Sequence, residues 1–245
     1  MLLGQSLKLI KEKDYERKGK AMGLFHKLRR KKSIGPPWLY SEKEWDTIEN
    51  HIKKYFGDYE NVFHEIFSPD IHLDIICIEP TKERNHYTLV TMGAGAYRMN
   101  VPEGASIPSR AEYLITLPPD WVIDSQREDE HGWPLRFLKK VARIPVNADT
   151  YLAYGHTISE DEDNSPFASN TKLCSIALAY PKQFAPESSL ATLPDGSELV
   201  FYQMVPLYAD ELQFKRQCKG EMEEFETYLG SVLSTPLDIH RESVV

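Results

Sequence analysis

The glycines that follow an apolar run are the first place where this sequence could do chemistry. The run Tyr87–Thr91 predicts a strand, and it leads directly into Met92-Gly-Ala-Gly95. A Gly-x-Gly turn after a strand can hold a phosphate on its backbone N–H groups. However, the third glycine of a dinucleotide loop is missing, and Pro102 and Pro108 stand where a helix should follow. We therefore predict no nucleotide site and no cofactor.

Histidine and aspartate side chains offer a second kind of site. His72 and Asp74 lie two residues apart on a predicted strand, so they share a face and could bind a metal together. The remaining candidate ligands are scattered along the chain: His64, His86 and His156. The sequence has no His-Glu-x-x-His motif and no dense His/Cys cluster, so we predict a polar strand face and no metal. A metal-dependent enzyme that uses His72 and Asp74 stays an alternative, which requires stoichiometric metal in the purified protein.

Candidate nucleophiles are equally isolated. Cys77 and Cys174 lie in apolar runs, where burial raises the pKa of a thiol and makes it inert. Three serines close to one another lack the Gly-x-Ser-x-Gly motif of hydrolases: Ser159, Ser165 and Ser169. The acidic run Glu160–Asp163 lacks the spacing of a calcium loop. We predict no catalytic residue and no enzymatic activity.

Three helices are predicted around these residues. Ser41 and Glu44 form a capping box ahead of a stripe of apolar side chains that ends at Gly57. A second helix covers Trp133–Arg143, and Ile144-Pro145 is expected to end it. A third, charged helix covers Asp210–Leu229, with an interruption at Gly220.

Strands dominate the remainder of the chain. Besides Tyr87–Thr91, the predicted strands cover Val62–Phe67, Leu73–Ile78, Ala111–Leu117, Tyr151–Thr157, Leu173–Tyr180 and Glu198–Pro206. Asp195-Gly196 predicts a hairpin turn before the last of them. Helices are too few for regular β-α-β crossovers, so we predict an α+β fold with a mixed or antiparallel sheet and a few flanking helices.

Composition places the chain among globular proteins of a reducing compartment. It has 245 residues, of which 41% are hydrophobic and 27% charged, and its three cysteines include no Cys-x-x-Cys pair. No apolar run is long enough to span a membrane, so a cytoplasmic protein is expected. We divide the chain into a basic leader at 1–37, with Met22 as a candidate start, a domain at 38–230, and a tail at 231–245 that is expected to fray.

The charge is distributed unevenly. Residues 1–34 hold 11 Lys/Arg and 3 Asp/Glu and carry +8, so the remainder of a chain with net charge −8 carries −16. An acidic domain repels nucleic acid phosphates and favours a cationic or neutral protein partner. We expect a protein partner, no nucleic acid and no membrane; the sequence does not determine the oligomeric state.

An ordered series of short motifs resembles the suppressor-of-fused domain family between about Trp38 and Glu211. The motifs are Ile71-His-Leu-Asp-Ile75, Tyr87-Thr-Leu-Val-Thr-Met-Gly93, Arg110-Ala-Glu-Tyr-Leu-Ile-Thr-Leu-Pro-Pro-Asp-Trp121, Trp133-Pro-Leu135, Ala142-Arg143, Tyr154-Gly-His-Thr157, Pro166-Phe167 and Phe201-Tyr-Gln-Met-Val-Pro-Leu-Tyr208. The resemblance implies an α+β domain that binds protein and does not catalyse. Animal members hold an extended peptide between two lobes, and this chain is too short for the full second lobe.

The length and the acidic domain fit the bacterial single-domain members better, which resemble immunity proteins of polymorphic toxin systems. The resemblance therefore predicts an immunity protein that binds and neutralises a cognate toxin. The alternative is a regulatory scaffold that sequesters a transcription factor or another protein. We expect the contacts with the partner at exposed positions around the glycine turn and the loops: Met92, Tyr97, Arg98, Tyr154, His156, Glu160 and Asp161.

Overall fold

The structure is a computed structural model that describes residues 36–123, 130–218 and 222–245. The predicted basic leader, including Met22, lies outside the described residues except for its last two positions. The predicted interruption at Gly220 also lies outside them.

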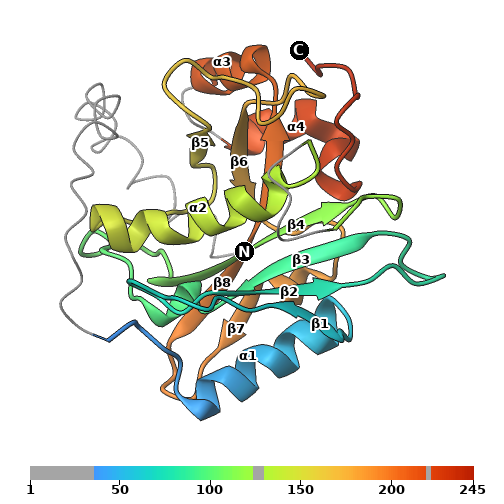
Figure 1. Ribbon diagram of the computed structural model, residues 1–245. Coiled ribbons are helices and arrows are strands. Elements are labelled where there is room, and N and C mark those ends of the chain that lie inside the picture. The colour runs from blue at the N-terminus through green and yellow to red at the C-terminus, as the bar shows by residue number, and fades with distance from the viewer. Residues whose placement is uncertain (1–35, 124–129, 219–221) are drawn as a thin grey trace, which may run out of the picture. The chain divides into compact units, whose positions relative to one another are not determined.

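One eight-stranded mixed sheet organises the described residues (Figure 1). Its strands are β1 (Asn61–Phe63), β2 (Asp74–Ile78), β3 (Tyr87–Met92), β4 (Arg110–Leu117), β5 (Thr157–Ser159), β6 (Ser175–Ala179), β7 (Leu190–Thr192) and β8 (Glu198–Leu207). The order is β1-β2-β3-β4-β8-β6-β5, and β7 also pairs with β8. The β4–β8 pair is parallel and the other pairs are antiparallel, which confirms the predicted α+β fold.

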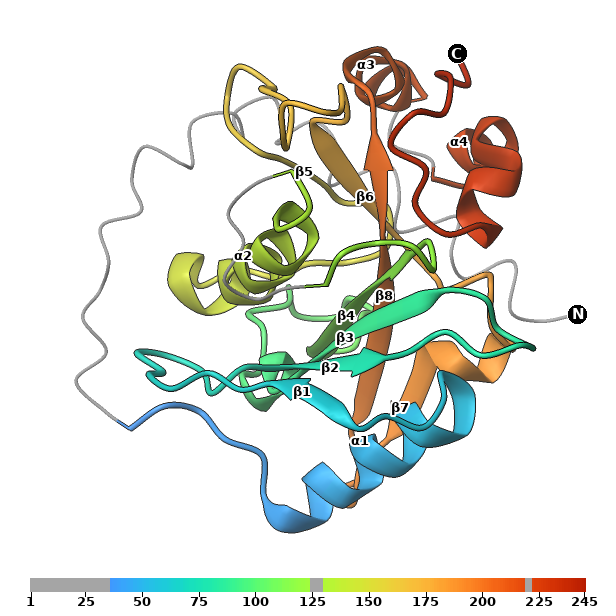
Figure 2. The same cartoon turned by 45° about the vertical axis from the view of Figure 1, so that its right-hand side comes forward.

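Helices cover both faces of this sheet. They are α1 (Glu42–Tyr55), α2 (Trp133–Ala148), α3 (Ala209–Gln217) and α4 (Met222–Leu229), together with short 3-10 turns η3 (Ala94–Ala96), η4 (Pro186–Ser189) and η5 (Gly230–Ser234). Figures 1 and 2 show α2 on one face and α1 on the opposite face. In place of the one interrupted helix predicted over 210–229, the structure has two helices, α3 and α4. Within the described residues, every helix is too short or too polar to span a membrane.

Strand β8 shows how alternation builds two cores. Its even-numbered residues Val200, Tyr202 and Met204 pack into the core under α2. Its odd-numbered residues face the other way, where Leu199 and Phe201 join Ile48 and Ile52 of α1. Further along the strand, Val205 and Leu207 on that same face pack against Phe225 of α4. Successive side chains of a strand point to opposite faces, so one strand contributes to three apolar clusters.

The first helix forms as its sequence predicts. Ser41 and Glu44 make the reciprocal capping box, and the backbone N–H of Gly57 donates to Ile52 O at 3.1 Å where the helix ends. The Asp195-Gly196 hairpin between β7 and β8 is also confirmed, with Gly196 at φ +80°.

Three element boundaries differ from the prediction by four or more residues. Helix α2 continues through Pro145 to Ala148, because the half-buried side chains of Ile144 and Val146 pack on the core and hold the last turn. Strand β1 stops at Phe63, since the following residues turn away to meet Asp74. The predicted strand over 151–157 begins only at Thr157, beyond a turn in which Gly155 has φ +81°.

The C-terminal residues pack against the domain, so the expectation that they fray is wrong. Arg241 binds both carboxylate oxygens of Glu211 at 2.5 and 2.6 Å and donates to Pro206 O at 3.0 Å. The Leu237 N–H donates to Thr116 O of β4 at 2.9 Å. A fully buried carboxylate on α3 thus fixes a segment whose sequence looked like a tail.

Candidate functional site

The glycine turn after β3 is a site of close packing. Gly93 has φ +125°, and a Cβ there would lie 2.0 Å from the His72 carbonyl oxygen. A Cβ on Gly95 would lie 2.4 Å from the Tyr40 hydroxyl. A side chain at either position would therefore collide with neighbouring protein atoms, and this close packing accounts for both glycines without a bound ligand.

The backbone N–H groups of this turn bind a side chain of the protein itself. Those of Gly93, Ala94 and Gly95 donate to the carboxylate of Glu112 at 2.9, 3.3 and 3.1 Å. The hydroxyls of Tyr40 and Thr91 donate to the same carboxylate. Burial raises the pKa of Glu112, and these donors oppose that shift. The backbone N–H groups that a phosphate would need are thus engaged by an internal carboxylate.

Arg110 ties the turn to the first helix. Its Nε donates to Gly95 O at 2.6 Å, and its Nη1 lies 2.5 Å from Glu44 Oε1 in the capping box of α1. The guanidinium also lies over the Tyr40 ring, 5.4 Å from the centroid. Glu112 and Arg110 were not among the predicted site residues. The sequence did offer one indication of their role, because both are charged residues within an otherwise apolar strand.

His72 and Asp74 take part in a polar network at the start of β2. Buried Asp74 accepts from Glu65 N at 3.2 Å and lies 3.0 Å from His64 Nδ1 and 3.6 Å from His72 Nε2. His72 Nδ1 lies 3.0 Å from the Ser68 hydroxyl. Across the described ranges, no group of three or more His, Cys, Asp or Glu side chains is placed to hold a metal ion.

All three cysteines are buried thiols without a disulfide. Burial raises the pKa of Cys77 to about 12, and it also raises the pKa values of Cys174 and Cys218. A protonated, enclosed thiol is a poor nucleophile, as the sequence of the apolar strands indicated for Cys77 and Cys174.

The predicted contact residues fall into separate places. Met92 is fully buried, so the expectation that it is exposed is wrong. It is the last residue of β3, and its side chain packs in the apolar cluster that includes Ile48 and Ile52 of α1. Tyr97 is half-buried, with its hydroxyl 3.1 Å from Asp149 and its ring against Trp38. Exposed Arg98 pairs with Asp195 of the β7–β8 turn at 2.6 Å.

The other four predicted residues lie elsewhere in the fold. Tyr154 stacks on Tyr180 at 4.8 Å, and the His156 ring lies 5.2 Å from Tyr151. Glu160 meets Lys140 of α2 at 3.2 Å. The exposed carboxylate of Asp161 accepts from the Ser165 N–H at 2.9 Å. The sequence predicted Tyr154 and His156 in a strand and Glu160 and Asp161 in the acidic run that follows it, and in the structure the four side chains make different contacts.

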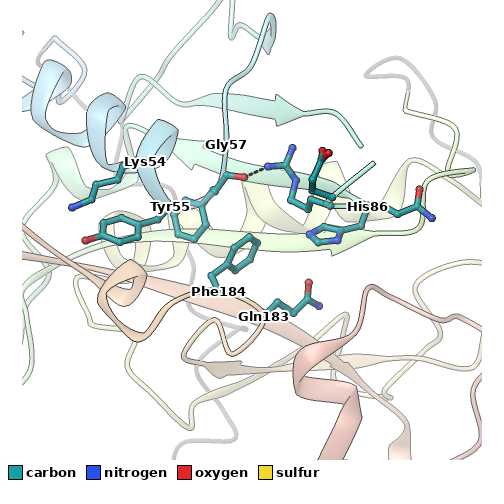
Figure 3. Close-up of a pocket in the computed structure, with 10 residues that line it drawn as sticks. Lys54, Tyr55, Gly57, His86, Gln183 and Phe184 are labelled. Carbon is teal, nitrogen blue, oxygen red and sulfur yellow. Dashed lines mark hydrogen bonds between the residues drawn. The ribbon is translucent and has the colours of Figure 1, made fainter. Parts of the chain in front are cut away.

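A pocket of about 440 Å³ lies where the end of α1 meets the turn between β2 and β3. Figure 3 shows Tyr55, His86, Gln183 and Phe184 around it. Burial and the nearby charge of Arg84 lower the pKa of His86 to about 4, so this imidazole is neutral at neutral pH. Arg84 itself donates to Phe56 O and Glu79 O and closes the end of the helix. No serine, threonine or cysteine is among the described residues that line the pocket.

The family described as "Suppressor of fused protein (SUFU)" matches residues 69–242, which is most of the chain. This chain belongs to the suppressor-of-fused family. No curated protein sequence was found to match it.

Solved structures agree in fold. A putative suppressor-of-fused homologue from Neisseria gonorrhoeae superposes with a TM-score of 0.59 at 16% identity, covering 84% of this chain and 98% of that one. The structure of a Sufu-Fu complex gives a TM-score of 0.55 at 17% identity, covering 85% and 93%. Drosophila Suppressor of Fused gives 0.51 at 16% identity, covering 82% of this chain and 51% of that one. At these identities the matches establish the fold alone.

Proposed function

We propose that this chain is a non-catalytic protein-binding domain that acts in the cytoplasm as an immunity protein, binding and neutralising a cognate toxin. Membership of the family supports a binding role, since one structure of similar fold is a Sufu-Fu complex. The structural match covers 98% of the Neisseria homologue, which supports a comparison of this chain with single-domain members of the family.

The acidic charge of the folded domain carries the proposal. The residues after 34 hold a net charge of −16. A toxin that attacks nucleic acid needs a basic surface to bind phosphates, and such a surface is attracted to an acidic inhibitor. Charge complementarity of this kind accelerates association and disfavours partners of like charge. Of the predicted contacts, Arg98 and Asp161 are the exposed ones, and they stay candidates for this interface.

Co-expression tests the proposal. The gene next to this one is expressed from an inducible promoter in a sensitive host, with and without this chain, and growth is followed. Neutralisation should restore growth, and the two purified proteins should form a complex that weakens as salt is raised. Loss of growth that this chain does not relieve, together with no complex, would contradict the immunity role. A bound partner without toxicity would instead favour the regulatory scaffold.

A further inference from the structure

Four large apolar side chains are exposed at one end of the sheet. Trp38 and Leu39, just before α1, are 55% and 60% exposed, and Ile66 and Phe67, in the loop between β1 and β2, are 102% and 78% exposed. Single exposed apolar side chains are ordinary, but a group of large ones marks an interaction site.

Backbone hydrogen bonds hold these two segments beside each other. The Trp38 N–H donates to Asp70 O at 2.8 Å, and the His72 N–H donates to Trp38 O at 3.1 Å. Trp38 therefore forms a parallel bridge with Ile71, four residues after Phe67. Figures 1 and 2 both show the segment before α1 next to the β1–β2 loop. We call Trp38, Leu39, Ile66 and Phe67 the apolar end surface.

Side-chain contacts on both flanks fix the loop that carries Ile66 and Phe67. On one side, Arg143 of α2 binds Glu65 at 2.6 Å and Asp70 at 3.1 Å. On the other side, buried Asp74 accepts the Glu65 N–H at 3.2 Å. The loop is thus tied at both ends to α2 and β2. A surface that is ordered before binding loses less entropy when a partner docks.

Two carboxylates on α1 lie next to this surface in the sequence. Glu42 follows Leu39 by three residues, and Asp46 lies one helical turn further on, so both exposed side chains share one face of the helix. We call Glu42 and Asp46 the acidic pair. The other two acids of α1 are engaged within the domain: Glu44 binds Arg110 at 2.5 Å, and Glu49 binds Lys53 at 2.8 Å.

The acidic pair has no such role inside the domain. Neither carboxylate forms a side-chain hydrogen bond or an ion pair with any part of the chain that the structure describes. Like charges at four-residue spacing destabilise a helix. The helix dipole favours an acid in the first turn, which accounts for Glu42 but not for Asp46. The stability of α1 therefore does not explain why Asp46, a second carboxylate with no partner among the described residues, stands at this position.

We propose that the apolar end surface and the acidic pair together form the docking surface for the protein partner. The occupant is a protein segment that presents aliphatic or aromatic side chains to the apolar end surface and Lys or Arg to the acidic pair. The apolar side chains supply the buried area, and the carboxylates select a basic partner. This inference rests on the proposed function, because it names the part of the domain that a basic toxin would contact.

The apolar half of the surface is tested with one paired variant and a matched control. Ile66→Ser/Phe67→Ser removes apolar area from the end surface, and Leu190→Ser/Tyr228→Ser removes exposed apolar side chains elsewhere. Thermal unfolding checks that both variants are folded.

The acidic half is tested in the same way. Glu42→Gln/Asp46→Asn removes both charges and keeps the size of the side chains. Glu223→Gln/Glu224→Gln makes the same change of charge at exposed positions of α4. Thermal unfolding again checks that both variants are folded.

The probe is a labelled amphipathic peptide of leucine and lysine, with a leucine and glutamate peptide as its counterpart. Fluorescence anisotropy should show that the lysine peptide binds wild type more tightly. The apolar variant should raise its Kd about tenfold or more, and the neutralised variant about threefold or more, with little change in the controls. Equal affinity of the surface variants and wild type, equal losses in the controls, or equal binding of the two peptides would overturn the proposal.

The growth assay separates this inference from the proposed function. If wild type restores growth and both surface variants restore it equally well, the docking surface is wrong while the immunity role stands. If wild type fails to restore growth but the peptide results hold, the immunity role is wrong and the docking surface stands for another partner.

Discussion

Replacing Arg241 by alanine should destabilise the whole domain, although Arg241 lies close to the end of the sequence. Its guanidinium forms two parallel bonds with Glu211, whose side chain is fully buried, and one with the Pro206 carbonyl. Removing one partner of a buried pair leaves an uncompensated charge, which costs about 3–5 kcal/mol. The N–H groups of Tyr208 and Val244 also bond to Glu211, so the lower half of that range is expected.

Urea unfolding followed by tryptophan fluorescence measures this effect. With a slope of about 2 kcal/mol per molar urea, a loss of about 3 kcal/mol lowers the midpoint by roughly 1.5 M. Arg241→Lys keeps the charge but loses the two-pronged geometry, so its loss should be intermediate. A double-mutant cycle with Glu211→Ala should give a coupling energy of about 2 kcal/mol or more.

The matched control is Arg98→Ala. Arg98 also pairs with a carboxylate at 2.6 Å, but both side chains of that pair are about half exposed, 54% and 46%. A solvent-exposed pair contributes at most about 1 kcal/mol. If Arg241→Ala and Arg98→Ala shift the midpoint equally, the argument that Glu211 anchors the C-terminal residues is refuted.

Three further outcomes are expected. Glu112→Gln should lower the free energy of unfolding by about 2–3 kcal/mol, because one carboxylate oxygen that accepts hydrogen bonds becomes a donor. Since the folded-state pKa of Glu112 is raised, its stabilising contribution relative to glutamine is greatest below about pH 4 and falls as pH rises through the folded pKa. Urea titrations of both proteins from about pH 3 to 8 measure this dependence. Gly93→Ala should lower the free energy of unfolding by about 2–4 kcal/mol in the same assay, because the new Cβ would meet a carbonyl oxygen. Gly104→Ala is the control: a Cβ there has nothing within 4 Å, so the loss should be only about 1 kcal/mol. Equal losses of stability in the two variants would contradict the packing role of the turn. Cys77 should not react with a thiol reagent at about pH 8 until the protein unfolds, since burial raises its pKa to about 12, and rapid labelling of the native protein would show that the thiol is accessible.

Local patterns were sufficient for much of the fold. The capping box at Ser41, the alternation through the strands and the Asp195-Gly196 turn predicted real elements, because each depends on interactions between residues close in sequence. The same patterns failed at Pro145, where a proline usually ends a helix but core packing carries it on to Ala148. Tertiary burial outweighed the local preference at that point.

The candidate site divides in the same way. The sequence by itself argued against a nucleotide loop at the glycines and predicted inert cysteines, and it determined the charge of the domain. Only the tertiary structure showed that Glu112 fills the glycine turn, that Met92 is buried, and that Glu211 holds Arg241. The contacts of Glu112 with the turn and of Glu211 with Arg241 join residues 17 to 30 positions apart, and sequence spacing cannot predict which distant side chains meet once the sheet has formed.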